Sequence, residues 1–187
     1  MRKNFFKLLI IFGICITYHA FGYNEVDLNK LLKTKKCPQG NFSQATLSNK
    51  DLRETDLRYG NFEAAVLQNT DFRYADLRRA NFSGADLDEA TLIGAKLTEA
   101  QLQRADLFNA DLRKANIARA NLSVANLQKA DLSDAILDGA NLKHANLYKA
   151  NLNGASLRDA KNVDINYLKK VTDCCDTILP DGSKYSN

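Results

Sequence analysis

The chain has 187 residues, with 26 lysines and arginines against 22 aspartates and glutamates, two histidines, no tryptophan and a formal net charge of +4. This length accommodates one domain with flanking segments. Residues 1–22 contain three of the basic residues and no acidic one, so their removal leaves 23 basic against 22 acidic residues. The basic charge therefore belongs largely to the N-terminus and does not favour a nucleic-acid-binding protein.

Residues 1–22 have the features of a secretory signal peptide. Basic residues up to Lys7 precede an apolar run from Leu8 to Thr17, and the small residues Ala20 and Gly22 stand where a signal peptidase would cut. This run is too short to span a bilayer as a helix. We predict a bacterial protein exported to the periplasm or secreted, in contact with the membrane only through this segment. The alternative is an uncleaved membrane anchor.

Residues 23–39 predict a short helical cap. Asn24 is a typical N-cap residue, Asp27 follows it in the first turn, and Pro38 would end the segment. The apolar side of the helix is expected to consist of Leu28, Leu31 and Leu32.

Residues 40–159 follow an uninterrupted five-residue period, in which every fifth residue is Leu, Phe or Ile and, from Ala75 onward, Ala stands two positions earlier. An α-helix would spread such a set around its circumference, and a flat strand would send alternate members to opposite faces. The chain must therefore turn once per unit, which predicts an all-β solenoid. The early units depart from this pattern, with Gly40, Lys50, Thr55, Gly60 and Thr70 at the Ala position. A buried unpaired ammonium is costly, so we expect the first coil to be looser or Lys50 to escape at its open end.

Motifs that recur at twenty residues, such as Asn41-Phe42, Asn61-Phe62 and Asn81-Phe82, indicate four units per coil and about six coils. Amides stacked along one side are expected to bond to one another as a ladder. This column contains Asn41, Asn61, Asn81, Gln101, Asn121 and Asn141.

The segments Ala105-Asp106-Leu107, Ala120-Asn121-Leu122 and Ala145-Asn146-Leu147 resemble the A-[D/N]-L-x-x pattern of pentapeptide repeat proteins. The resemblance covers residues 40–159. It implies a right-handed quadrilateral β-helix whose narrow interior is filled by Leu or Phe and Ala.

Residues 160–187 are expected to form a C-terminal cap and tail. A second short helix is predicted from Asp164 to Val171, with Ile165 and Leu168 on its apolar side, and a turn follows at Pro180-Asp181-Gly182. Repeats stack only on their neighbours, so both ends of a solenoid need such covers.

Three cysteines would remain after cleavage, with Cys37 at one end of the rod and Cys174 and Cys175 at the other. The two ends are too far apart for a disulfide unless the tail folds back, so an intermolecular bridge or free thiols are the alternatives. Together with the distant His144, they do not make a recognisable metal site. We expect no metal and no cofactor.

Nothing in the chain has the spacing of a catalytic motif. Aspartate pairs such as Asp86 with Asp88, or Asp131 with Asp134, occupy outward positions, where solvated charge is the ordinary state. The sequence therefore predicts a protein that is not an enzyme.

Two surface clusters are candidate interaction sites. The first combines arginines with aromatic residues on two adjoining sides of the early coils, and consists of Arg53, Arg58, Tyr59, Arg73, Tyr74, Arg78 and Arg79. Such a set can hold an anionic polymer. An Asp two positions before four of these arginines favours local charge pairing instead. Stacked carboxylates along one side repel one another unless Arg53, Arg73 and Arg113 or a bound cation offset them, and charge pairing with the arginines is the simpler account. This column contains Asp51, Asp71, Thr91, Asp111, Asp131 and Asn151.

The second cluster is Phe108 and Tyr148, which share a column with Gln128 between them and lie near Val124. Outward aromatic residues are typical of a protein interface, although scattered apolar residues are also ordinary on a surface.

These observations favour an exported, non-enzymatic interaction or scaffold module with a protein partner, and they leave a homo-oligomer open. The family resemblance supplies an alternative, because some pentapeptide repeat proteins mimic DNA and bind DNA gyrase. Mimicry needs a strongly acidic rod, whereas residues 40–159 carry 16 acidic and 15 basic residues, a net charge of −1.

Overall fold

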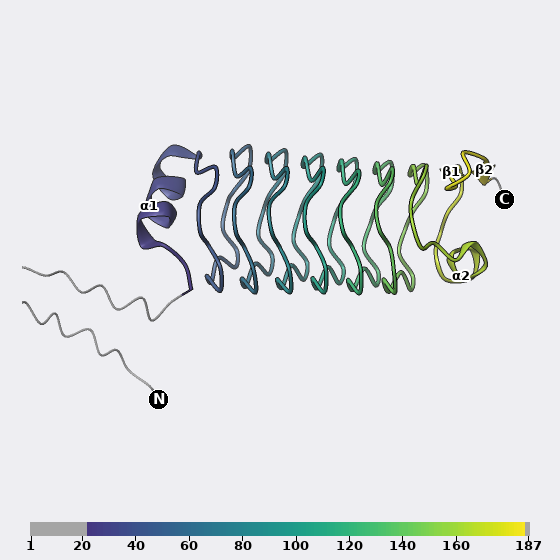
Figure 1. Cartoon of the computed structure of the whole chain (residues 1–187), viewed down its shortest axis with the longest axis horizontal. Coiled ribbons are helices and arrows are strands. Elements are labelled where there is room, and N and C mark those ends of the chain that lie inside the picture. Colours follow the sequence, from purple (N-terminus) through teal and green to yellow (C-terminus); the bar gives the residue numbers. More distant parts are fainter. Residues whose placement is uncertain (1–21, 186–187) are drawn as a thin grey trace, which may run out of the picture.

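The structure is a computed structural model that describes residues 22–185. It is a rod of stacked coils with helix α1 (Glu25–Thr34) at one end (Figure 1). Helix α2 (Ile165–Val171) and a hairpin of strands β1 (Thr177–Ile178) and β2 (Lys184–Tyr185) lie at the other end. The predicted signal peptide lies outside the described residues except for Gly22. Among residues 22–185, no helix is long and apolar enough to cross a membrane.

Each unit contributes one extended residue, the one before the inward Leu or Phe, to a parallel bridge with the residue twenty positions later. The four columns of bridges define four sides of the rod. We number them from the residues with which they start in the first coil: side 1 from Asn41, side 2 from Thr46, side 3 from Asp51 and side 4 from Lys36. A coil therefore contains four units, as the twenty-residue recurrences predict.

Each side ends in a tight corner. The second residue after the inward Leu has a left-handed backbone, with φ of 59° at Tyr59 and 62° at Val124, and an i to i+3 bond such as Gly60 N–H to Leu57 O at 3.0 Å closes the turn. Before the corner, the Asn or Asp side chain accepts from the backbone N–H two residues later, as Asn41 does from Ser43 at 3.1 Å. This local bond explains the preference for Asn and Asp at that position.

The rod is filled by the predicted residues. The inward Leu, Phe and Ile side chains are at most 4% exposed. In the first coils the side 1 column contains a stack of phenylalanines, with ring centroids 4.9 Å apart for Phe42 and Phe62 and 4.8 Å apart for Phe62 and Phe82. The same column continues with Leu102, Leu122 and Leu142. The interior is thus one continuous apolar core, whose side 1 column is aromatic in the first coils and aliphatic in the later ones.

The irregular inward positions are accommodated individually. Thr55 and Thr70 are buried, and each hydroxyl donates to a backbone carbonyl, of Leu52 at 2.7 Å and of Leu47 at 2.9 Å. Lys50 is exposed, so its ammonium does not occupy the interior. The cost of a buried ammonium is thereby avoided.

The amide ladder on side 1 exists in two parts. Asn61 donates to Asn41 at 3.4 Å and Asn81 to Asn61 at 3.2 Å, and beyond the middle of the rod Asn141 donates to Asn121 at 3.3 Å. The expectation of one continuous column is wrong at Gln101. Its longer side chain bonds instead to the carbonyl of Glu99 at 3.4 Å.

Helix α1 covers the N-terminal end of the core. The Asn24 side chain accepts from the N–H groups of Val26 and Asp27, and the Asp27 carboxylate in turn accepts from the backbone N–H of Asn41 at 2.8 Å. Leu31 is fully buried, whereas Leu32 is 48% exposed and does not belong to the apolar side. Adjacent helical residues point about 100° apart, so the stripe centred on Leu31 excludes its neighbour.

The boundaries of the rod differ from the sequence-based segments. The helix ends at Thr34, and Lys36 already bridges to Asp56, so the coils begin before residue 40. At the other end, Asp173 bridges to Asn151 and Ile178 to Ser156. The segment after α2 therefore rejoins the rod as further sides and is more than a tail.

The three described cysteines are free. Cys37 is buried in the first coil, whereas Cys174 and Cys175 lie beyond α2 at the opposite end of the rod, so no bond joins the two ends (Figure 1). Burial raises the pKa of both the Cys37 and the Cys174 thiols. Cys175 is exposed.

Candidate interaction surfaces

The arginines of the first cluster are held by aspartates from their own units. The residues before and after an inward Leu both point outward from the same side, so Asp and Arg two positions apart meet. The shortest nitrogen–oxygen distances are 2.9 Å for Arg53–Asp51, 2.8 Å for Arg58–Asp56, 2.6 Å for Arg73–Asp71 and 2.6 Å for Arg78–Asp76. Arg53 and Arg73 lie on side 3, and Arg58 and Arg78 lie on side 4.

These pairs are forked, because two nitrogens of one guanidinium reach one carboxylate. Arg58 donates through Nε and Nη2 to the two oxygens of Asp56, at 2.8 Å each, and Arg78 does the same to Asp76. The hydrogen bonds from these arginines hold the pKa values of Asp56 and Asp76 below the ordinary value. The local charge pairing predicted from the sequence is confirmed, and it leaves little free positive charge for an anionic polymer.

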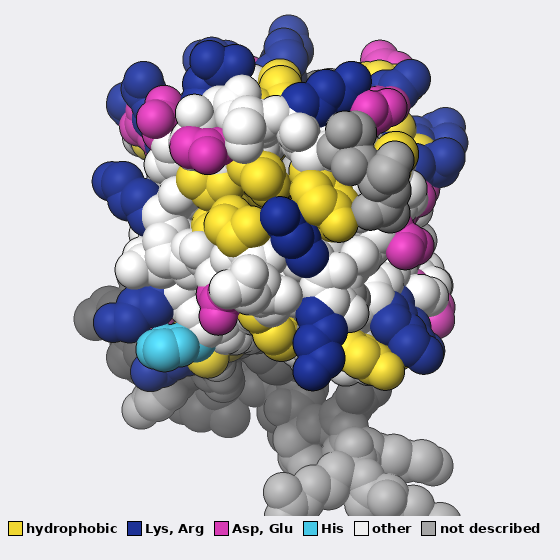
Figure 2. All heavy atoms as spheres, turned by 90° about the vertical axis from the view of Figure 1, so that its right-hand side faces the viewer, with side chains coloured by type: hydrophobic (Ala, Val, Ile, Leu, Met, Phe, Trp, Pro, Cys, Tyr) yellow, Lys and Arg dark blue, Asp and Glu magenta, His cyan; other side chains and the backbone are white. Residues whose placement is uncertain are grey.

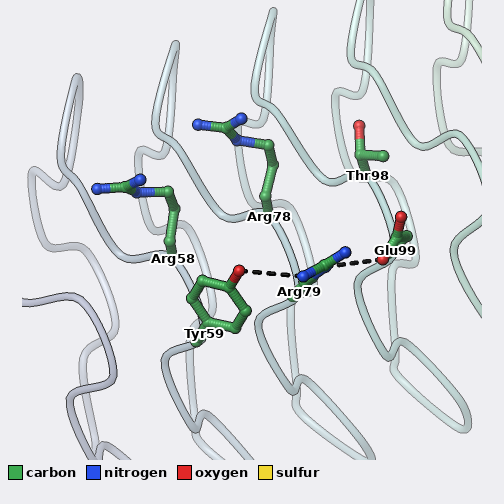
Figure 3. A pocket seen from close by; sticks show the side chains of 6 residues that line it. All are labelled: Arg58, Tyr59, Arg78, Arg79, Thr98 and Glu99. Carbon is green, nitrogen blue, oxygen red and sulfur yellow. Dashed lines mark hydrogen bonds and ion pairs between the residues drawn. The ribbon is translucent and has the colours of Figure 1, made fainter.

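The corner after side 4 carries a column that runs along the rod (Figure 3). Arg79 donates to the Glu99 carboxylate at 2.7 Å and to the Tyr59 hydroxyl at 3.1 Å, and its guanidinium carbon lies 5.7 Å from the centre of the Tyr59 ring. The three residues follow one another at twenty-residue spacing in successive coils. They line a shallow groove of about 230 Å³ together with Arg58, Arg78 and Thr98.

Tyr74 occupies the neighbouring corner, after side 3, and is 62% exposed. Its ring lies over Gly94, one coil further on, where a Cβ atom would come within 2.7 Å of the ring. Gly94 also has a φ of +63°, which glycine adopts without strain. The absence of a side chain at Gly94 thus lets Tyr74 lie along the rod with one face open.

The second cluster lies on side 2 and includes two lysines that the sequence analysis did not single out. The Lys129 ammonium lies 5.1 Å from the centre of the Phe108 ring, and Lys149 lies 5.4 Å from that of Tyr148. Tyr148 is 46% exposed, and Val124 on the preceding corner is 54% exposed. Each lysine is in the corner column next to side 2. Their position beside the aromatic residues could therefore have been predicted from the twenty-residue period.

The structure separates the predicted residues into distinct surfaces. Tyr59 and Arg79 make contact, and so do the four Asp–Arg pairs on sides 3 and 4, whereas Phe108 and Tyr148 lie on side 2. The first cluster is therefore a charge-compensated surface with two exposed tyrosines. The second is a separate surface of aromatic side chains and lysines.

The aspartate pairs considered for catalysis have different surroundings. Asp131 accepts from the backbone N–H and the hydroxyl of Ser133. Burial, followed by the charges of Glu89, Asp106 and Asp86, raises the pKa of Asp88, one of whose oxygens is buried without a hydrogen-bond partner. In the described part of the chain, no group of three His, Cys, Asp or Glu residues is placed to hold a metal ion.

Comparison with known proteins agrees with the repeat architecture. The family model for pentapeptide repeats matches in eight copies, over residues 41–73, 51–84, 61–98, 85–123 and 125–161. A search of curated protein sequences finds no match.

Solved structures of pentapeptide repeat proteins are also similar. Rfr23 from the cyanobacterium Cyanothece 51142 is 28% identical, with 70% of this chain and 92% of Rfr23 covered and a TM-score of 0.46. A protein of the Arabidopsis thaliana thylakoid lumen is 28% identical, with 82% and 86% covered and a TM-score of 0.37. Full-length QnrB1, a plasmid-mediated fluoroquinolone resistance protein, is 19% identical, with 70% and 77% covered and a TM-score of 0.36.

The family model spans well over half of the chain, and the five-residue period, the four-sided coils and the Leu, Phe and Ala core account for the match residue by residue. The chain belongs to the pentapeptide repeat family.

Proposed function

We propose that this protein is an exported, non-enzymatic interaction module that presents side chains on a rigid rod to a protein partner. The observation that carries the proposal is the exposure of large aromatic and apolar side chains on an otherwise polar surface. Tyr59 is 49% exposed, Tyr74 is 62% exposed and Tyr148 is 46% exposed. Tyrosine is enriched in protein interfaces because it combines apolar area with a hydroxyl, and it frequently supplies much of the binding energy.

The rigidity of the rod supports this function. Tyr59 and Tyr74 project from corners whose backbone is bonded to the next coil, with Tyr59 N–H to Arg78 O at 3.0 Å and Tyr74 N–H to Ile93 O at 3.0 Å. A backbone fixed in this way loses little conformational freedom on binding. The paired arginines beside them help to orient a partner without providing a strongly charged surface.

The near balance of charge along residues 40–159 gives no support to DNA mimicry or gyrase binding. Export is supported by the basic and apolar pattern of residues 1–22, which lies outside the described residues except for Gly22.

Cell fractionation and N-terminal sequencing test the export half of the proposal. The protein should leave the cytoplasm and begin at Tyr23. A protein retained in the cytoplasm with its N-terminus intact would refute export.

Affinity capture from the compartment in which the protein is found tests the interaction half. A partner retained by the native protein should be reduced when Tyr59 and Tyr74 are both replaced by Ala, while Lys114→Glu, on a distant part of the same corner column as Tyr74, should retain it. Substrate turnover by the purified protein, abolished by one polar substitution, would show instead that the protein is an enzyme.

A further inference from the structure

One side of the last coil ends without the strand that should follow it. Side 1 continues from Asn141 to Lys161, side 3 from Asn151 to Asp173 and side 4 from Ser156 to Ile178. On side 2, the described residues contain no bridge beyond Asn146. The chain between Lys161 and Asp173 forms α2 instead of the next side 2 unit. The helix thus bypasses one position in the β-helix.

Because α2 replaces the next side 2 unit, three backbone groups of the last coil are left without a hydrogen-bond partner in the described part of the chain. One coil earlier, Leu127 N–H donates to Asn146 O at 2.8 Å, Lys129 N–H donates to Tyr148 O at 3.0 Å, and Ala125 O accepts from Asn146 N–H at 2.9 Å. The corresponding groups in the last coil are Leu147 N–H, Lys149 N–H and Ala145 O. Among residues 22–185, none of these three has a hydrogen-bond partner. They form an open strand edge.

The residues of this edge are covered to different extents, because Leu147 is only 4% exposed whereas Tyr148 and Lys149 are exposed. Leu168 of α2 is buried against the core, but Ala145 is only partly buried, whereas every other alanine at the inward position of residues 45–160 is at most 9% exposed. Figure 2 looks onto this end of the rod and shows apolar side chains exposed among polar, basic and acidic ones. The cap therefore covers Ala145, whose carbonyl belongs to the edge, less completely than the other inward alanines.

The surroundings of the edge are basic. From Gly139 to Arg158 the chain contains no aspartate or glutamate, while it contains Lys143, His144 and Lys149, and Lys161 follows on side 1. All four of these residues are exposed, and none forms an ion pair within the described residues. Tyr148 adds an exposed ring at the same edge. A segment bound here would lie beside lysines that form no ion pair with the described residues.

We infer that the side 2 edge of the last coil binds an extended, acidic segment of a partner protein, which adds one strand to the β-helix. The segment's carbonyls accept from Leu147 N–H and Lys149 N–H, and one of its N–H groups donates to Ala145 O. Main-chain bonds of this kind provide affinity, and the lysines and Tyr148 select acidic and apolar side chains. This inference rests on the proposed function and adds to the exposed tyrosines of the first coils a second contact, at which an extended acidic segment of the partner binds.

A second copy of the chain does not fit this position. Adjacent strands lie about 4.8 Å apart, whereas the caps at both ends contain helices about 10 Å in diameter, which would meet before two rods came into strand contact. The exposed Lys30, Lys33 and Lys36 at the α1 end would also face the lysines of the last coil. A single extended segment meets neither obstacle.

Titration of the purified protein with short peptides, followed by amide NMR, tests the inference. A peptide of alternating Glu and Val should shift the amide resonances of Leu147 and Lys149 and slow their hydrogen exchange. A Lys-Val peptide, and the acidic peptide interrupted by a central Pro, should do neither. Unchanged Leu147 and Lys149 amides at saturating acidic peptide, or equal binding of the Pro or Lys peptides, would overturn the inference.

A charge reversal with a matched control makes the test specific. Lys149→Glu should weaken the acidic peptide about tenfold, while Lys114→Glu should leave its affinity unchanged. Lys114 is exposed and has a φ of 58° against 59° for Lys149, so the two substitutions place the same residue in the same kind of corner. Equal effects of the two variants would contradict binding at this edge.

Two further results separate this inference from the proposed function. A native partner captured equally well by Lys149→Glu and by the unmodified protein would refute the edge as the binding site but leave the interaction function standing. An oligomer in light scattering that dissociates on Lys149→Glu would show that a second copy occupies the edge and would also overturn the inference.

Discussion

The first coils and the last coil differ in whether their charged side chains and backbone groups have partners. On sides 3 and 4 of the first coils, Asp56 and Asp76 neutralise Arg58 and Arg78 within their own units. In the last coil, Lys149 has no carboxylate partner, and its backbone N–H has no acceptor within the described residues. The same repeat therefore produces a closed surface at one end and an unsatisfied edge at the other, which teaches that departures from the period carry more functional information than the period itself.

The largest expected effect tests the inward and outward assignment on which this comparison depends. Leu107 is 1% exposed, so Leu107→Asp places an unpaired charge in the core and should cost roughly 4 kcal/mol or more of unfolding free energy. Gln128→Asp, at an outward position on side 2, should be nearly silent. Urea unfolding of both variants measures the difference. Equal tolerance at the two positions would refute the register.

The next effect compares the aromatic and aliphatic halves of one core column. Phe62 stacks on both neighbouring rings, so Phe62→Ala should cost about 3–5 kcal/mol, whereas Leu122→Ala should cost about 2–5 kcal/mol and fall below the Phe62 value. Both losses can be measured from the denaturant midpoints, provided that the dependence of the unfolding free energy on denaturant concentration is unchanged. A greater loss at Leu122 would show that the ring stack does not make the first coils more sensitive than the later ones.

The next prediction compares the reactivity of the exposed and the buried cysteine thiols at the two ends of the rod. Cys175 is exposed and should react readily with iodoacetamide at mildly alkaline pH. Cys37 and Cys174 are buried and have raised thiol pKa values, so they should react slowly until the protein unfolds. Peptide mass spectrometry of the alkylated protein measures each site. Rapid labelling of Cys37 in the folded protein would contradict its burial beneath α1.

The smallest effect concerns the forked pairs. The pKa of Asp56 is lowered by Arg58, so the stability that this pair contributes is present above the unfolded value of about 4 and is lost as the pH falls through the lower folded value. Arg58→Gln should therefore lower the stability slightly at neutral pH, and the difference from the native protein should shrink below about pH 4. Because the pair is partly exposed, added salt should also reduce the difference. A difference that grows in acid would have the wrong sign.

The body of the rod could be predicted from the sequence because each unit repeats the same local chemistry. An inward Leu fixes the interior, and an Asn or Asp bonded to the N–H two residues later fixes the corner, so residues such as Asn41 and Arg58 could be assigned a side and a direction.

The ends could not be predicted in the same way. The exposure of Leu32, the entry of Lys36 into the ladder and the return of Asp173 to side 3 depend on how single segments pack on one exposed coil. The roles of Lys129 and Gly94 were also not predicted, because they depend on the residue one coil away. The role of Gln101 was not predicted because its longer side chain bonds back to the carbonyl of Glu99.

Amide hydrogen exchange of the free protein tests the central contrast most directly. Leu127 and Lys129 have acceptors in the next coil, whereas Leu147 and Lys149, in the same two columns, have none within the described residues. The amides of Leu127 and Lys129 should be strongly protected, and those of Leu147 and Lys149 should exchange quickly under the same conditions. Equal protection of the two pairs would contradict an open edge on side 2 of the last coil.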